Sequence, residues 1–247
     1  MPSLFEHLGR KAGRGLRKAN WVYHSVAGSE ETALAAEQKV GRGLAAELRR
    51  SLTACRDETV RRRCQATLEQ LTNRLTDKKR RFHVSVVEDE AANAFALPGG
   101  FLFITSGLNE LCREDPDSLA FILGHEMAHV VRRHAINRVV TNAVFSTLAG
   151  AAPARSLAHL WLKRVGFKFV TSAYSRTHEE EADEFAVRIM KAAGYDPAAG
   201  PRMLAKLQDA QKDQDSRPQG ETIGKYFGSH PPLKARATRL RRLARTL

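Results

Sequence analysis

The residues of this chain that could do chemistry are concentrated in the pentad His125-Glu126-Met127-Ala128-His129, which reads H-E-x-x-H. Residues four apart on an α-helix point the same way, so His125 and His129 could hold one metal ion. Glu126 is turned by about 100° from His125, which leaves its carboxylate beside the metal rather than on it. There it could take a proton from a zinc-activated water. The pentad therefore predicts a zinc site with its own general base.

The segment around the pentad is predicted to be helical. Asp115 can cap a helix, and Pro116 suits the first helical position, where the backbone needs no N–H partner. Apolar residues then recur at 3.6-residue spacing, which predicts one helix from Pro116 to about His134. On such a helix His134 rotates off the ligand face, so we expect it at the surface near the helix end.

A catalytic zinc ion usually has three protein ligands, so the third must come from outside the pentad. The continuation H-E-x-x-H-x-x-G-x-x-H fails, because Arg132 and Ala135 stand where the glycine and the third histidine are needed. The best second segment is a predicted helix within residues 174–190. Its periodicity leaves both His178 and Glu179 beside the buried stripe. The spacing alone does not choose between these two residues as the third ligand.

Two segments upstream of the pentad predict a β-hairpin. Phe101–Thr105 is β-branched and aromatic, follows the turn Pro98-Gly99-Gly100, and could pair with Ala92–Ala96. An exposed edge there would accept an extended peptide by β-augmentation, in which backbone pairing reads little side-chain information. An ordinary core hairpin is the alternative interpretation, and both can hold at once. The residues expected to contact substrate are Asn93, Ala94, Phe95 and Ala96.

Four ordered motifs resemble those of the gluzincin metallopeptidases that include HtpX, the OMA-type peptidases and the CAAX prenyl proteases, peptidase family M48. They are the pentad, the later Ser-Arg-x-x-Glu-x-x-Ala-Asp, the segment Asn93-Ala-Phe-Ala-Leu-Pro-Gly-Gly100, and His230-Pro-Pro with Arg236 six residues after the histidine. The resemblance covers about residues 83–245. It implies a mostly α-helical α+β zincin fold, with a small β-sheet or hairpin beside the active-site helix.

The resemblance also implies the ligands of one zinc ion per chain, which would be His125, His129 and Glu179. Asp183 would accept a hydrogen bond from a ligand imidazole and fix its tautomer. His178 falls at a variable position and receives no metal role.

The donor that stabilises the developing oxyanion is left open by the sequence. A C-terminal histidine near the cleft could instead occupy the open zinc position and hold the enzyme latent, which is a second hypothesis for His230. The candidate oxyanion donors are His230, Arg236, Tyr174 and Tyr226.

The predicted function is a zinc-dependent endopeptidase that hydrolyses extended or unfolded protein segments, in protein quality control as the resemblance implies. Glu126 would take the proton of the attacking water and later pass it to the leaving amine. The alternative is a zincin-shaped binding or chaperone-like module that holds extended chains without efficient cleavage.

The chain is predicted to form a single domain of 247 residues, with an N-terminal helical segment (residues 1–80) packed on a metallopeptidase core (residues 83–247). Residues 29–80 indicate two long helices that break near Thr53 and form a hairpin over the core. The polar segment Asp209–Thr222 is predicted to be a loose loop leading to His230.

Composition bounds the partners of the chain. Its net charge of +13 arises from 40 basic and 27 acidic residues. The basic runs carry no nucleic-acid motif and few aromatic residues, so we expect no nucleic-acid partner. The first twenty residues have the pattern of a basic amphipathic helix, which could touch an anionic membrane or dock on its own domain. With no run near the ~20 apolar residues of a membrane span and no secretory signal core, a cytoplasmic or membrane-peripheral location is favoured, and an exported mature form is the alternative.

Overall fold

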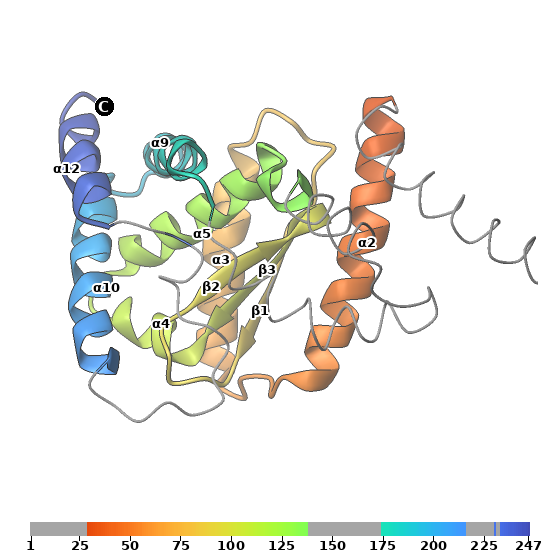
Figure 1. Ribbon diagram of the computed structural model, residues 1–247, viewed down its shortest axis with the longest axis horizontal. Helices are drawn as coiled ribbons and strands as arrows, with labels where there is room; N and C mark the ends of the chain where they lie inside the picture. The colour runs from red at the N-terminus through yellow and green to blue at the C-terminus, as the bar shows by residue number, and fades with distance from the viewer. Residues whose placement is uncertain (1–28, 138–173, 216–229, 231–232) are drawn as a thin grey trace, which may run out of the picture.

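The computed structural model describes residues 29–137, 174–215, 230 and 233–247, and Figure 1 shows several helices gathered around one small sheet. None of the described helices is long and apolar enough to cross a lipid bilayer. The predicted amphipathic helix of the first twenty residues and Tyr226 lie outside the described residues. The elements in chain order are α2 (Glu30–Ser51), α3 (Glu58–Asn73), β1 (His83–Val87), β2 (Ala94–Leu97), the 3-10 turn η1 (Pro98–Gly100), β3 (Phe101–Thr105), α4 (Ser106–Leu111), α5 (Pro116–Val131), α9 (Arg176–Ala193), α10 (Ala199–Asp215) and α12 (Leu233–Ala244). The predicted mostly helical α+β fold is confirmed.

The sheet has three strands in the order β1-β3-β2, with β1 parallel and β2 antiparallel to β3. The predicted hairpin is confirmed, because η1 joins β2 to β3 and Phe95 lies opposite Phe103. Gly99 (φ 76°) and Gly100 (φ 89°) adopt left-handed backbone conformations that residues with a side chain rarely adopt. The two glycines therefore make this tight connection possible.

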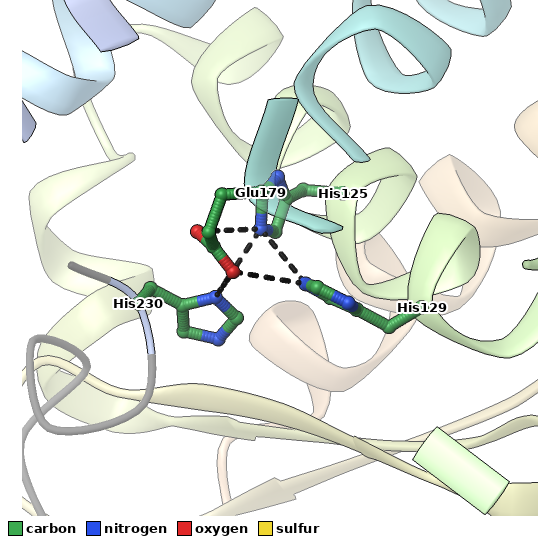
Figure 2. Close-up of side chains that lie close together, drawn as sticks. All are labelled: His125, His129, Glu179 and His230. Carbon is green, nitrogen blue, oxygen red and sulfur yellow. Dashed lines mark hydrogen bonds and ion pairs between the residues drawn. The ribbon is translucent and has the colours of Figure 1, made fainter. Parts of the chain in front are cut away.

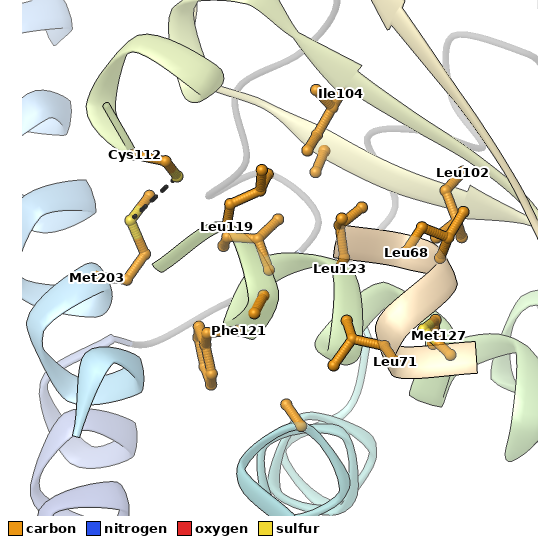
Figure 3. Packing of buried hydrophobic residues seen from close by; sticks show 14 of the residues in the cluster. Leu68, Leu71, Leu102, Ile104, Cys112, Leu119, Phe121, Leu123, Met127 and Met203 are labelled. Atoms are coloured by element: carbon orange, nitrogen blue, oxygen red, sulfur yellow. Dashed lines mark hydrogen bonds between the residues drawn. The ribbon is translucent and has the colours of Figure 1, made fainter. Parts of the chain in front are cut away.

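The two faces of the sheet bury different side chains, since successive residues of a strand point to opposite faces. Leu102 of β3 belongs to the cluster drawn in Figure 3, together with Leu68 and Leu71 of α3 and the apolar face of α5. Phe101 and Phe103 belong to a second cluster, which they form with α2. The sheet is thus covered by α3 and α5 on one face and by α2 on the other.

The predicted break between the two N-terminal helices is confirmed, but the predicted hairpin is wrong. α2 buries Leu44 and Ala45 against the aromatic face of the sheet, whereas α3 packs on the opposite face. The apolar face of α2 is buried by the sheet and that of α3 by β1 and α5, so neither is left to cover the other. α2 also lies directly on η1, because a Cβ added at Gly41 would stand 1.6 Å from the carbonyl oxygen of Pro98.

A buried charge connects α2 to the end of α5. Glu37 of α2 is 1% exposed, and its carboxylate accepts hydrogen bonds from Arg80 (3.2 Å) and Arg133 (2.8 Å). Arg133 has a φ of 61°, a left-handed conformation that costs a residue with a side chain on the order of 1 kcal/mol. The ion pair with Glu37 therefore stabilises a strained turn just after α5.

The helix that carries the pentad, α5, packs closely on α9. The two helices approach closely at Gly124, where an added Cβ would lie 3.2 to 3.3 Å from Ile189 and Ala186 of α9. α9 begins after Ser175, whose Oγ accepts a hydrogen bond from the backbone N–H of His178, and ends at Gly194 with a φ of 86°. Ser175 and Gly194 thus cap the two ends of α9.

Of the segment Asp209–Thr222, predicted as a loose loop, residues 209–215 are helical and belong to α10, and residues 216–222 lie outside the described residues. α10 is anchored in the core by Met203, Leu204 and Leu207. Its polar continuation contains no glycine or proline before Pro218, so nothing in its composition stops the helix earlier.

Candidate metal centre

Four side chains from three separate parts of the chain converge between α5, α9 and the residues before α12. They are His125 and His129 of α5, Glu179 of α9, and His230, as Figure 2 shows. One ligand atom from each of the four lies within 4.8 Å of the other three, and all four side chains are buried. Histidine nitrogens and a carboxylate are the donor set that zinc prefers in catalytic sites.

The spacing of the donors also fits a metal ion. The Nε2 atoms of His125 and His129 are 3.1 Å apart, and each lies 3.4 to 3.6 Å from an oxygen of Glu179. Two ligands on a tetrahedral zinc ion, each about 2.0 to 2.1 Å from it, are about 3.3 to 3.4 Å apart. His230 approaches the same group, with Nδ1 2.9 Å from Glu179 and 3.3 Å from His125. The four donors therefore point at a common position that suits a zinc-sized cation.

A second layer of charged groups surrounds these donors. Asp183, one turn after Glu179 on α9, places Oδ1 3.0 Å from Nδ1 of His125. Arg236 of α12 donates two hydrogen bonds to the Asp183 carboxylate (2.9 and 2.7 Å), and its Nη1 lies 2.5 Å from Glu179. Arg236 is 4% exposed, so its guanidinium is buried between the two carboxylates.

The electrostatics of the cluster favour a positive charge at its centre. Burial raises the pKa of the Glu179 carboxyl, but the nearby His230 and Arg236 outweigh burial and hold this pKa well below its usual value. Burial lowers the pKa of His125, yet hydrogen bonds to Asp183 and Glu179 raise it to about 9. For His129 burial dominates and holds the pKa well below 6.5. The carboxylates thus stabilise a cation at the Nε2 position of His125, whether a proton or a metal ion.

Glu126 lies beside this group, as the predicted general base should. Its side chain is 1% exposed, and within the described residues its carboxylate accepts no hydrogen bond. The ring of His230 lies next to it, with Nε2 3.4 Å from Oε1 of Glu126. A buried carboxylate without a hydrogen-bond donor is costly, so Glu126 is free to accept a hydrogen bond from a molecule that enters the site.

His134 corrects the sequence analysis, which placed it at the surface. α5 ends at Val131, and the left-handed turn at Arg133 brings the His134 ring back to His129. His134 is 4% exposed, and its Nδ1 lies 3.1 Å from Nδ1 of His129. Burial, reinforced by the neighbouring His178, lowers the pKa of His134 to about 4.

A second ring stacks on each of His129 and His134. Tyr174 stacks on His129 with ring centroids 3.7 Å apart, and His178 stacks on His134 at 4.0 Å. Tyr174 was a predicted oxyanion donor, and the structure shows its ring lying flat against a predicted ligand. His178, which the periodicity left open as a ligand, contacts His134 instead of the donor group.

The predicted substrate strand lies beside α5 at the edge of the sheet. Residues 93–96 are buried as whole residues, backbone included, so this edge is covered in the structure. Asn93 bonds to Thr105 of β3, and backbone groups alternate between the two edges of a strand. The N–H and C=O groups of Ala94 and Ala96 therefore point away from β3, and no strand pairs with this edge in the described part of the chain.

Comparisons with known proteins agree with this arrangement. The sequence model of peptidase family M48 matches residues 58–244. The mitochondrial metalloendopeptidase OMA1 of Schizosaccharomyces pombe is 33% identical over 171 residues, which are 67% of this chain and 47% of that protein. The OMA1 protein of Arabidopsis thaliana is 30% identical over 156 residues, 63% of this chain and 30% of that protein. The beta-barrel assembly-enhancing protease of Escherichia coli O157:H7 is 28% identical over 193 residues, 74% of this chain and 39% of that protein.

The chain thus spans less than half the length of each of these relatives. The family match begins at Glu58, the first residue of α3, and not near residue 83 as the motifs indicated. α3 is part of the family region because it covers one face of the sheet beside α5. The match takes in the H-E-x-x-H helix, the acidic helix α9 and the C-terminal histidine, and it covers more than half of the sequence. The chain belongs to peptidase family M48.

Proposed function

We propose that this chain is a zinc-dependent endopeptidase that hydrolyses extended segments of protein. The observation that carries the proposal is the convergence of His125, His129 and Glu179 on one position, with the Glu126 carboxylate beside it. Family membership supports the same reaction class, since the relatives named above are described as metalloendopeptidases or proteases.

His125, His129 and Glu179 would hold the zinc ion, which would polarise the scissile carbonyl and a water molecule. Asp183 accepts a hydrogen bond from Nδ1 of His125 and so keeps Nε2 of that ring available as a ligand. Glu126 takes a proton from the attacking water on one carboxylate oxygen and delivers it to the leaving nitrogen. Burial of all these groups excludes bulk water and strengthens each electrostatic contact.

The two C-terminal residues of the predicted catalytic set receive different roles. Arg236 holds Asp183 and Glu179 in place through its buried guanidinium, so we assign it a positioning role rather than contact with substrate. His230 reaches both Glu179 and Glu126, so it fills the space a substrate carbonyl would need. We propose that His230 keeps the site latent in this arrangement and must withdraw before substrate enters.

Substrate would bind along β2. Once this buried edge is uncovered, the outward backbone groups of Ala94 and Ala96 would pair with an extended peptide beside α5, the helix that carries Glu126. Backbone pairing selects extended conformation more than side-chain identity. A role in protein quality control is therefore part of the proposal, because unfolded proteins expose extended segments.

The test compares wild type and Glu126→Gln on an unfolded protein such as casein, with the zinc content of both measured. If wild type cleaves, Glu126→Gln does not, and both hold about one zinc ion, the proposal stands with Glu126 as the base. If neither cleaves although both hold zinc, the chain is latent or is a binding module for extended segments. If neither holds zinc, the site assignment is wrong.

A further inference from the structure

His134 and Glu181 form a hydrogen-bonded chain that ends on His129. Nδ1 of His134 lies 3.1 Å from Nδ1 of His129, and Nε2 of His134 lies 3.2 Å from Oε2 of Glu181. His134 is 4% exposed, whereas the Glu181 side chain is 46% exposed at the surface of α9. The chain therefore runs from a solvated carboxylate to the ring of a proposed metal ligand.

One arrangement of protons satisfies both contacts with neutral rings. The Glu181 carboxylate can only accept a hydrogen bond, so Nε2 of His134 must donate to it. A neutral His134 then has an unprotonated Nδ1, which can only accept, so Nδ1 of His129 must donate. A neutral His129 that donates through Nδ1 has a lone pair on Nε2, and that atom faces His125 and Glu179. The chain thus dictates the tautomer that a metal ligand needs.

We infer that His134 is a positioning residue, which fixes the tautomer and ring orientation of His129 and is itself anchored by Glu181. It is the counterpart of Asp183, which lies against Nδ1 of His125. The two ligand histidines are held differently. The buried carboxylate of Asp183 contacts His125 directly, whereas the neutral ring of His134 lies between His129 and the carboxylate of Glu181. The inference rests on the proposed function, because it presupposes a metal ion at Nε2 of His129.

The local backbone supports this role. A regular continuation of α5 would turn His134 away, and the chain instead adopts the left-handed turn at Arg133. Such a conformation persists only where surrounding contacts enforce it, and here Glu37 of α2 accepts a hydrogen bond from Arg133. His178 packs flat on the other side of the His134 ring. Three elements therefore hold His134 at one hydrogen-bond distance from His129.

The test measures zinc affinity by chelator competition in His134→Leu and His134→Gln. Leucine cannot accept the His129 proton, so zinc affinity should fall by about 10- to 100-fold. Glutamine can accept from His129 through its oxygen and donate to Glu181 through its nitrogen, so it should recover most of the loss. His178→Leu is the comparison variant, since it removes a ring packed on His134 but breaks no hydrogen bond of the chain, so zinc affinity should fall far less than in His134→Leu. The visible absorption of the Co²⁺-loaded protein should change in His134→Leu and stay close to wild type in His134→Gln.

The outcomes separate this inference from the proposed function. Zinc binding without casein cleavage in both wild type and His230→Ala contradicts the proposed function alone, and the affinity comparison still decides the role of His134. A folded His134→Leu with wild-type zinc affinity overturns the inference, as does a glutamine variant no better than leucine. If His134→Leu does not fold, Glu181→Ala replaces it, because this half-exposed residue is removable without a cavity. The inference then requires a smaller but measurable loss of zinc affinity. Wild type that binds neither zinc nor Co²⁺ overturns both.

Discussion

Replacing Arg236 with methionine should destabilise the metal-free protein far more than replacing its neighbour on α12, Arg239. Arg236 is 4% exposed and contacts the carboxylates of Asp183 and Glu179 at 2.5 to 2.9 Å. Arg239 also faces two carboxylates, those of Glu180 and Glu184, but is 43% exposed. The pair of variants therefore removes the same charge from the same helix in a buried and in a solvated setting.

The magnitude follows from burial. Removing one partner of a buried ion pair costs about 3 to 5 kcal/mol, because the remaining charge is left without compensation. Two carboxylates are left here, so the upper part of that range is expected for Arg236→Met. An exposed pair contributes about 0 to 1 kcal/mol, which is the expectation for Arg239→Met. Methionine keeps most of the apolar stem of arginine, so the comparison isolates the guanidinium.

The assay is urea unfolding of the chelator-treated proteins, followed by circular dichroism. With a denaturant dependence of about 3 kcal/mol per molar, the midpoint of Arg236→Met should fall by about 1.3 to 1.7 M, and that of Arg239→Met by about 0.3 M or less. Adding Asp183→Asn to Arg236→Met removes one of the two uncompensated buried charges, so the unfolding midpoint of the double variant should be higher than that of Arg236→Met. Equal midpoints for the two single variants would refute the reasoning.

The difference in unfolding free energy between wild type and Arg236→Met should depend on pH, and the sign of this dependence follows from the pKa shifts. The pKa values of Asp183 and Glu179 are lowered in the folded protein, against ordinary values of 3.8 and 4.5. Their contribution to stability is therefore complete above about pH 4.5 and is lost as the pH falls through the lower folded-state values. The difference in unfolding free energy between wild type and Arg236→Met should therefore become smaller below about pH 4.5.

Three further predictions follow from contacts described above. His230→Ala should raise basal casein cleavage with zinc content unchanged, because the residue fills the approach to Glu126; unaltered cleavage would count against latency. Ala96→Pro should lower kcat/KM by about tenfold through the loss of an outward N–H, while the circular dichroism spectrum stays that of wild type; unchanged kcat/KM would exclude β2 as the substrate strand. Gly41→Ala should destabilise the chain by about 1 to 3 kcal/mol, since its Cβ would stand 1.6 Å from the Pro98 oxygen. Gly43→Ala on the same helix meets open space and should stabilise the chain by about 0.5 to 1 kcal/mol. Equal unfolding midpoints of the two variants would show that α2 does not pack on η1.

The features that could be predicted from the sequence are those that depend on neighbours within a few residues. His125 and His129 share a helix face because they are four apart, and Ser175 and Gly194 cap α9 through their own local chemistry. The convergence of Glu179 on these histidines was expected from a family resemblance, because periodicity alone left His178 equally placed.

The features that could not be predicted depend on partners distant in the sequence. α5 ends three residues early because Arg133 is held by Glu37, 96 residues before it, and this early end is what brings His134 inward. Arg236 looked like an oxyanion donor until Asp183, 53 residues away, was seen to receive its guanidinium. A clue was available for His134, since Glu181 on the acidic helix offers it an acceptor, but spacing alone does not show that the two helices meet.

The position of α2 shows that the start of sequence similarity to the family and the start of the folded unit are two different boundaries. Sequence similarity to the family begins at Glu58, yet α2, which precedes it, covers Phe101 and Phe103 on one whole face of the sheet. A recombinant fragment cut at the edge of similarity would leave that aromatic face bare, and bare aromatic sheets associate with one another. The smallest unit that stays soluble and folded is therefore expected to begin before α2, near Ser29, so homology underestimates here the length of chain that must fold together.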